Sequence, residues 1–210
     1  MKSPWIGILG LVSLFFLPGG CVRVTKSFPE KRYYILDVAQ GEKAARAAHG
    51  PALRVNKLRV SHRFEGNGMV YRRGELNYEA DFYHEFLVPP GSLLTEELSK
   101  WLAASGLFQY VTAAAGQIQP THILEGTVSA LYGDFRNGAT PRAILEIEFY
   151  LLRDHSAQND ILFQNAYAEE VPLREPSPEA LVQGWNDALR RILTSLENDL
   201  RGIDLAATVP

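Results

Sequence analysis

The most regular pattern in the chain is an alternation of apolar and polar residues in its second half. Residues 121–135, 142–153 and 161–171 show it, and side chains that alternate in this way point to opposite faces of a β-strand. Asn137-Gly138 separates the first two stretches and is a strong signal for a tight turn, and a second polar turn precedes the third. The pattern therefore predicts three successive strands that form an antiparallel meander.

The alternation also predicts which side chains face the core. In the first stretch one face is expected to hold Leu124, Val128, Ala130 and Tyr132, and the other Glu125, Thr127 and Ser129. In the second stretch the core face is expected to hold Ala143, Leu145, Ile147, Phe149 and Leu151. Glu146 and Glu148 then fall on the polar face, and an exposed strand face explains them more simply than a catalytic carboxylate pair.

Two further stretches have the apolar spacing of amphipathic helices, about 92–105 and 178–200. The first is expected to bury Leu94, Leu98, Trp101 and Leu102 and to expose Glu96, Glu97 and Lys100, with Ser92 as its N-cap and Gly106 as its stop. The second has Ser177 as the expected N-cap and Pro178 in its first turn. Its apolar stripe consists of Leu181, Trp185, Ala188, Leu189, Ile192, Leu196 and Leu200.

The first half of the chain is less regular. Residues 32–38 are rich in β-formers and predict the first strand, on which Tyr33 and Tyr34 point to opposite faces. For these tyrosines a packed core position is favoured over stacking on a ligand. Residues 53–61 predict an imperfect strand and residues 76–87 an extended segment. The whole pattern predicts an α+β fold, with a largely antiparallel sheet packed by the two main helices.

The chain begins with a stretch that reads as an export signal. Lys2 precedes an uncharged apolar run from Trp5 to Leu17, and Pro18-Gly19-Gly20 then leads to Cys21, the only cysteine of the chain. The run is too short to span a bilayer, which takes about 20 residues. The stretch resembles a bacterial lipoprotein signal, in which Cys21 is acylated, although Pro18 stands where such signals carry Leu. The alternative is an ordinary cleaved signal that leaves Cys21 as a free thiol or discards it.

These features predict how the chain is organised. Residues 1–20 are the expected signal peptide, residues 21–31 the lipidated cysteine and tether, residues 32–201 a single domain, and residues 202–210 a tail. The net charge is −3, and loss of Lys2 with the signal leaves −4. Acidic and basic residues are interspersed, which argues against a nucleic-acid-binding protein.

No catalytic or metal-binding motif is evident. The five histidines, His49, His62, His84, His122 and His155, are scattered without metal-ligand spacing, and phosphate-binding and nucleophile motifs are absent. His84 and Glu85 are adjacent and should point apart on a strand. We therefore expect no enzyme activity, no cofactor and no metal.

Several segments together resemble one protein family, the ABC-type transport auxiliary lipoproteins associated with MCE-domain transporters. They are Arg32-Tyr33-Tyr34-Ile35-Leu36, MVYRRGELNYEADFYHEF at 69–86 followed by Pro89-Pro90, SGLFQYV at 105–111, HILEGTVSALYGDF at 122–135 followed by AILEIEFYLL, and FQNAYAEEVPL before a helix with Trp185 and Ala188. The resemblance covers about residues 30–200. The family commonly has a Trp shortly before the double proline, where this chain has Phe86-Leu87-Val88.

The resemblance implies a noncatalytic, lipid-anchored periplasmic protein that helps to move lipids or other hydrophobic molecules between the inner and outer membranes. Its implied partners are an MCE-domain protein and an ABC permease and ATPase on separate chains, and self-association is left open. Val22 follows Cys21 in place of the Asp that retains lipoproteins in the inner membrane, which favours the outer membrane. The alternatives are direct carriage of a lipid and an outer-membrane assembly lipoprotein that partners a β-barrel.

Overall fold

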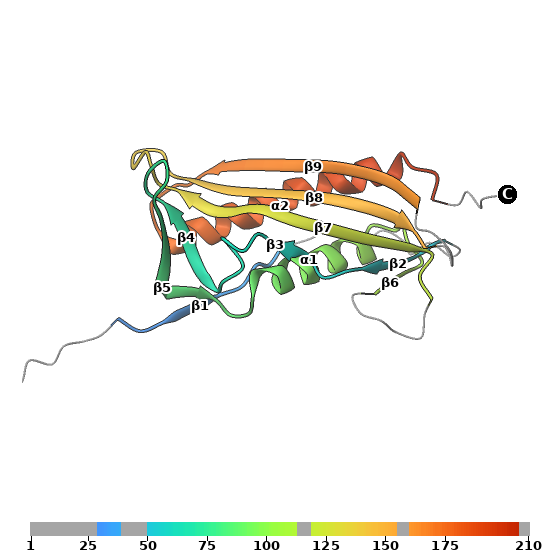
Figure 1. Ribbon diagram of the computed structural model, residues 1–210, viewed down its shortest axis with the longest axis horizontal. Helices are drawn as coiled ribbons and strands as arrows, with labels where there is room; N and C mark the ends of the chain where they lie inside the picture. The colour runs from blue at the N-terminus through green and yellow to red at the C-terminus, as the bar shows by residue number, and fades with distance from the viewer. Residues whose placement is uncertain (1–28, 39–49, 113–118, 155–159, 206–210) are drawn as a thin grey trace, which may run out of the picture.

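The computed structural model describes residues 29–38, 50–112, 119–154 and 160–205. In these residues it has nine strands and two helices, which confirms the α+β fold (Figure 1). The elements are β1 (Arg32–Tyr34), β2 (Ala52–Val55), β3 (Arg59–Val60), β4 (Gly68–Arg72), β5 (Tyr78–Phe86), α1 (Pro90–Ala104), β6 (Tyr110–Thr112), β7 (His122–Asp134), β8 (Arg142–Arg153), β9 (Asp160–Pro172) and α2 (Pro178–Arg201).

The predicted meander is confirmed and forms the long part of the sheet. Strand β8 pairs antiparallel with β7 along its whole length, from His122 opposite Arg153 to Asp134 opposite Arg142. Strand β9 pairs antiparallel with the other side of β8. The core face of β8 is the predicted one, since Leu145, Phe149 and Leu151 are fully buried.

Three short strands share the second edge of β7. Strands β2, β3 and β4 follow one another along it, each parallel to β7, with Leu53 opposite His122, Arg59 opposite Thr127 and Tyr71 opposite Gly133. The stretch predicted as one imperfect strand over 53–61 is thus two strands with a break between them. At the break, the N–H of Leu58 donates to Oγ1 of Thr95 in α1 rather than to β7.

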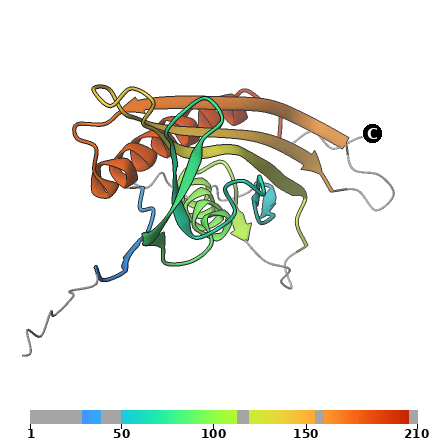
Figure 2. The same cartoon turned by 60° about the vertical axis from the view of Figure 1, so that its left-hand side comes forward.

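The rest of the sheet grows outward from these short strands. Strand β6 pairs parallel with β2, β5 pairs antiparallel with β4, and β1 pairs parallel with β5. The long pairings are therefore antiparallel, as predicted, and the short ones are mostly parallel. Figures 1 and 2 show β4 and β5 turning away from the meander toward β1.

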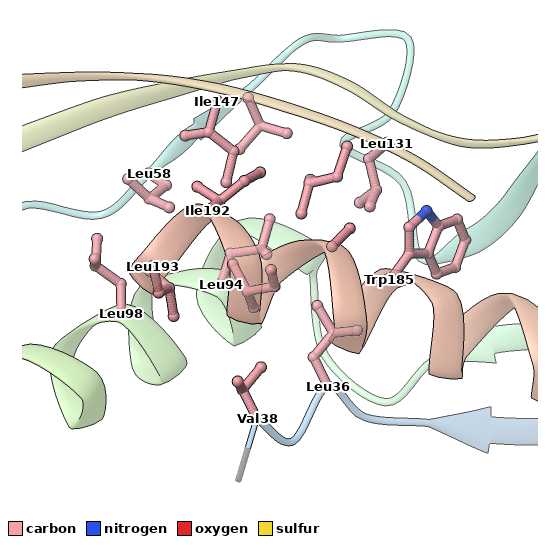
Figure 3. Close-up of a cluster of buried hydrophobic side chains, with 14 of the residues drawn as sticks. Leu36, Val38, Leu58, Leu94, Leu98, Leu131, Ile147, Trp185, Ile192 and Leu193 are labelled. Atoms are coloured by element: carbon pink, nitrogen blue, oxygen red, sulfur yellow. The ribbon is translucent and has the colours of Figure 1, made fainter. Parts of the chain in front are cut away.

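Helix α2 lies against one side of the meander, and helix α1 lies beside α2, against the short strands β2, β3 and β6. In Figure 3, Trp185 and Ile192 of α2 lie beneath Leu131 and Ile147 of the sheet, and Leu94 and Leu98 of α1 lie beside Leu193. Leu36 and Val38, which follow β1, close the other side of this cluster. Leu36 and Val38 therefore cover part of the helix pair on the side away from the meander.

A β-bulge in β7 makes the faces of this strand differ from the prediction. The register shifts between Val128, which is opposite Ile147, and Ala130, which is opposite Glu146, so Ser129 is an extra residue. Beyond the bulge Leu131 pairs with Leu145 on the core face, while Ala130 and Tyr132 pair with Glu146 and Ile144 on the other face, where Ala130 is nevertheless only 6% exposed. The prediction that Ala130 and Tyr132 share the face of Leu124 and Val128 is therefore wrong.

Helix α1 differs from its prediction at its start and on one face. It begins at Pro90, and Pro89 occupies the N-cap position, so Ser92 is not the cap. A proline suits the first turn of a helix because the N–H that it lacks would have no partner there. Gly106, at φ 75°, follows the end of the helix as expected. Glu97 was expected outside but is 4% exposed, since its carboxylate accepts the backbone N–H of Val38 at 2.8 Å.

Helix α2 follows its prediction. Oγ of Ser177 accepts the backbone N–H of Ala180 at 3.1 Å, which makes Ser177 the N-cap, and Pro178 is the first residue of the helix. Every residue of the predicted stripe is buried. None of the described helices is long and apolar enough to cross a membrane.

Candidate functional site at the tether end of the sheet

The predicted site residue, Cys21, lies outside the described residues, as does most of the tether. The described chain begins at Pro29, eight residues after Cys21, and the candidate site lies at this end of the sheet. Lys31, two residues further on, donates from Nζ to Oε1 of Glu85 at 2.7 Å, and the same Nζ lies 4.2 Å from the ring centre of Phe82. The hydrogen bond to Glu85 raises the pKa of Lys31. Two contacts thus hold the start of the domain on β5.

The side of β1 that faces the helices is fixed to α2. The hydroxyl of Tyr34 donates to Oε1 of Glu179 at 2.9 Å, and Nη1 of Arg32 lies 3.2 Å from the same oxygen. Burial, with the hydrogen bond to Glu179 in support, raises the pKa of Tyr34. The pKa of Glu179 is lowered, because its carboxylate accepts a hydrogen bond from the backbone N–H of Glu179 and another from the hydroxyl of Tyr34. Tyr34 is thus packed as predicted and serves the structure.

The other side of β1 is apolar and uncovered. Tyr33 lies opposite Glu85 in the parallel register, and continuing that register places Ile35 beside Leu87. Tyr33 is 55% exposed, Ile35 52% and Leu87 58%. The expectation that Tyr33 packs in the core is therefore wrong. Nine large apolar or aromatic side chains are exposed in the described ranges, and five of them form what we call the tether-end patch: Tyr33, Ile35, Phe82, Leu87 and Val88.

A carboxylate inside β5 holds the strand that carries the patch. Asp81 accepts the backbone N–H groups of Tyr83 at 2.8 Å and His84 at 3.1 Å, Nδ1 of His84 at 2.8 Å, and the hydroxyl of Tyr71 at 3.1 Å. Burial opposes the charge of Asp81, but these hydrogen bonds outweigh it and keep the pKa below its ordinary value of 3.8. His84 and Glu85 point apart as predicted, because Glu85 turns to Lys31.

The outer face of the meander has no helix over it in the described part of the chain (Figure 1). It holds a shallow depression of about 290 Å³, whose side chains include Thr127, Ser129, Glu146, Glu148 and Ala168. Glu146 accepts the hydroxyl of Ser129 at 3.0 Å, whereas Glu148 accepts Nε2 of Gln164 at 2.8 Å. The bond from Gln164 lowers the pKa of Glu148, which is the wrong direction for a general acid. The exposed-face interpretation of both glutamates agrees with this geometry.

Two other concave regions show no reactive constellation. A groove of about 420 Å³ is charged, but its charges pair with one another: Arg136 with Asp134 and Glu75, and Arg142 with Glu170. A second groove, of about 450 Å³, lies where α1 starts, beside Lys57, Val60 and His62. Within the described residues no group of His, Cys, Asp and Glu could hold a metal ion.

Comparison with known proteins gives the fold. No family model and no curated protein matches the chain. A crystal structure from Xanthomonas campestris, assigned to the family DUF330, matches at a TM-score of 0.67 with 17% identity, over 79% of this chain and 92% of that one. An uncharacterised protein matches at 0.63 with 16% identity, over 81% and 99%. A hypothetical protein from Chlamydia trachomatis matches at 0.50 with 8% identity, over 73% and 99%.

The chain therefore has the fold of the DUF330 protein from Xanthomonas campestris over most of its described length. At this identity the likeness extends to the fold and not to an activity or a partner. The resemblance to the MCE-associated lipoproteins stays a prediction.

Sequence reasoning missed the tether-end patch, although a signal for it is present. Residues 33–36 read Tyr-Tyr-Ile-Leu, so both faces of β1 are apolar, whereas a strand with one solvated face alternates. Leu36 is 3% exposed and Ile35 52%, which shows that only one of the two apolar faces was needed for the core.

Proposed function

We propose that this protein is a noncatalytic bacterial lipoprotein, anchored to the outer membrane through Cys21, which assists an MCE-domain ABC-type transport system that moves lipids or other hydrophobic molecules between the two membranes. The observation that carries the proposal is the apolar leader that ends in small residues at the only cysteine. Acyl chains add about 0.8 kcal/mol of membrane affinity for each buried methylene, so two or more chains would give stable anchoring.

The geometry of the described charges supports a noncatalytic role. The Asp81 carboxylate is used by backbone and side-chain donors of its own strand pair, and the Glu97 carboxylate by Val38 and Lys100. The sole cysteine is assigned to the anchor. In this proposal the ATPase and permease chains supply the energy and the path, and the lipoprotein supplies a binding surface on its sheet edges or loops.

The interior argues against direct carriage of a lipid between sheet and helices. The side chains that would line such a site, among them Trp185, Leu94, Leu98, Ile192 and Ile147, form one contiguous buried cluster (Figure 3). A bound acyl chain would have to displace them. We therefore favour the docking role over carriage, and native mass spectrometry of the purified protein should show no copurified lipid.

Replacement of the anchor tests the proposal. Wild-type protein should fractionate with the outer membrane and carry acyl groups on its N-terminal peptide, and Cys21→Ser should move to the soluble periplasm. Affinity purification of the wild-type protein should recover an MCE-domain protein. An unchanged membrane fraction for Cys21→Ser would refute the anchor. Recovery of a β-barrel protein without any MCE-domain protein would favour the outer-membrane assembly alternative.

A further inference from the structure

The tether-end patch is an uncovered apolar surface on an ordered part of the sheet. The exposed fractions of its side chains are 64% for Phe82, 58% for Leu87, 55% for Tyr33, 52% for Ile35 and 40% for Val88, while Leu36 and Phe86 on the opposite side are buried. Covering apolar surface would stabilise the protein by about 25 cal/mol for each Å² removed from water. Exposed apolar patches of this kind mark interaction sites, so we expect a partner to cover this one.

The position of the patch in the chain limits the answer. Pro29 is eight residues after Cys21, and an extended chain spans at most about 3.6 Å per residue, so this stretch reaches no further than roughly 29 Å. The patch begins at Tyr33, on the strand that directly follows the tether. A chain anchored at Cys21 therefore keeps this end of the domain, more than any other, near its membrane.

The long axis of the domain separates the patch from Ile161, another exposed aliphatic residue. In Figure 1, β1 lies at one end, whereas the start of β9, where Ile161 is also exposed, lies at the other. Because the tether leads directly to the patch, the membrane that holds the anchor is a large apolar partner close to the patch. The same membrane is far from Ile161.

The chemistry of the patch fits the bilayer interface. It combines Tyr33 and Phe82 with three aliphatic side chains, and a tyrosine, whose ring carries a polar hydroxyl, favours the level of the headgroups. Two of the basic residues beside it are already matched, since Lys31 pairs with Glu85 and Arg32 with Glu179. The contact should therefore depend on apolar burial and respond little to salt or to the lipid charge.

We infer that the tether-end patch rests on the bilayer that holds the acylated Cys21, so that the lipoprotein lies against its membrane in a fixed orientation instead of swinging on a free tether. The inference rests on the proposed lipid anchor. A second copy of the chain or a protein partner would be the alternative cover.

Site-directed labelling of the full-length acylated protein tests it. Acylation uses the thiol of Cys21, so Leu87→Cys provides a single free thiol for an environment-sensitive nitrobenzoxadiazole dye. Ile161→Cys, at a similarly exposed aliphatic residue, is the matched control. Both proteins are reconstituted into phosphatidylethanolamine and phosphatidylglycerol vesicles that contain doxyl-labelled lipid.

The expected result is blue-shifted emission at position 87 and quenching there at least threefold stronger than at position 161, unchanged between low and high salt. Equal, weak quenching at both positions in protein shown by mass spectrometry to be acylated would overturn the inference and leave the anchor intact. Protein that lacks acyl groups and does not float with the vesicles would instead refute the anchor.

A control without membrane separates the remaining alternative. In the Cys21→Ser background, the dye at position 87 should report water in a monomeric protein. Shielding of that dye in a dimer, without vesicles, would show that a second copy covers the patch and would overturn the inference.

Discussion

The ring of Phe86 packs against the indole of Trp185, with the two ring centroids 5.4 Å apart. Phe86 ends β5 and Trp185 lies in α2, and Nε1 of the indole donates to the backbone oxygen of Ile144 in β8 at 3.2 Å. One aromatic contact thus joins three elements that are distant in the sequence. Phe86 stands shortly before Pro89-Pro90, where the resembled family commonly has a Trp, and here the aromatic side chain serves the core.

Removing this ring should weaken the fold strongly. Phe86→Ala, made in the soluble Cys21→Ser protein, should lower the free energy of unfolding by about 3–5 kcal/mol, because the change leaves a cavity beside Trp185. Phe82→Ala in the same strand removes an exposed ring and its contact with Lys31, and should lower the free energy of unfolding by no more than about 1 kcal/mol. Urea denaturation measures both, and similar losses for the two variants would contradict the assignment of Phe86 to the core.

The buried carboxylate of α1 gives a second test. Glu97→Ala would leave the buried N–H of Val38 without its acceptor, which should cost about 1–3 kcal/mol. Glu96→Ala removes the other acidic partner of Lys100, a carboxylate whose side chain is 61% exposed, and should cost less than about 0.5 kcal/mol. If thermal denaturation shows equal losses, the bond to Val38 does not stabilise the segment after β1.

Asp81 should make the stability depend on pH. Its pKa is lower in the folded protein than in the unfolded chain, so its contribution is present above pH about 4 and is lost as the pH falls through the folded pKa. Asp81→Asn should therefore destabilise the protein by about 1–3 kcal/mol at pH 7, where the hydrogen bonds to the carboxylate are lost. The difference between wild type and variant should shrink between about pH 5 and pH 3 in chemical denaturation. A difference that stays constant over this range would contradict the assignment.

The contact between α2 and β8 leaves no room for a side chain at Gly184. A Cβ there would lie 2.7 Å from Cβ of Ala143 and 2.7 Å from Cδ2 of Leu173. Alanine in a helix interior normally gains up to about 1 kcal/mol over glycine, but Ala143 is fixed to its strand and cannot yield, so Gly184→Ala should destabilise the protein by about 1–3 kcal/mol.

Gly138 provides the control for this change, because a Cβ there would meet nothing within 4 Å. Gly138→Ala should leave the melting temperature nearly unchanged. A Gly184→Ala protein that melts as high as the wild type would mean that the helix can shift away from the sheet.

The parts of the fold that the sequence predicted are those set by local periodicity. Helix α2 shows this best, since its N-cap Ser177, its first residue Pro178 and the spacing of its apolar stripe are all determined by residues close together in the sequence. The parallel pairing of β2 with β7 joins residues 69 positions apart, from Leu53 to His122, and no local pattern encodes it. The bulge at Ser129 was hidden because Ala130 and Leu131 are both apolar and either could face the core.

The candidate site could be predicted only in part. Cys21 follows from the leader pattern and stays a prediction, since it lies outside the described residues. The tether-end patch could not be located from the sequence alone, because its exposure depends on which face of β1 pairs against the helices. That choice depends on distant contacts, among them the burial of Leu36 in the core and the hydrogen bond between Tyr34 and Glu179.

The second edge of β7, where β2, β3 and β4 lie end to end, has a consequence for the order of folding. These strands leave the ribosome more than 60 residues before the part of β7 that each one pairs with. Closing loops of this length takes entropy before any contact forms, and the earlier pairings of β4 with β5 and of β2 with β6 are too small to be stable alone. The chain should therefore stay unfolded until residues 122–134 are available, a property that would suit the passage through a narrow export channel that the leader predicts.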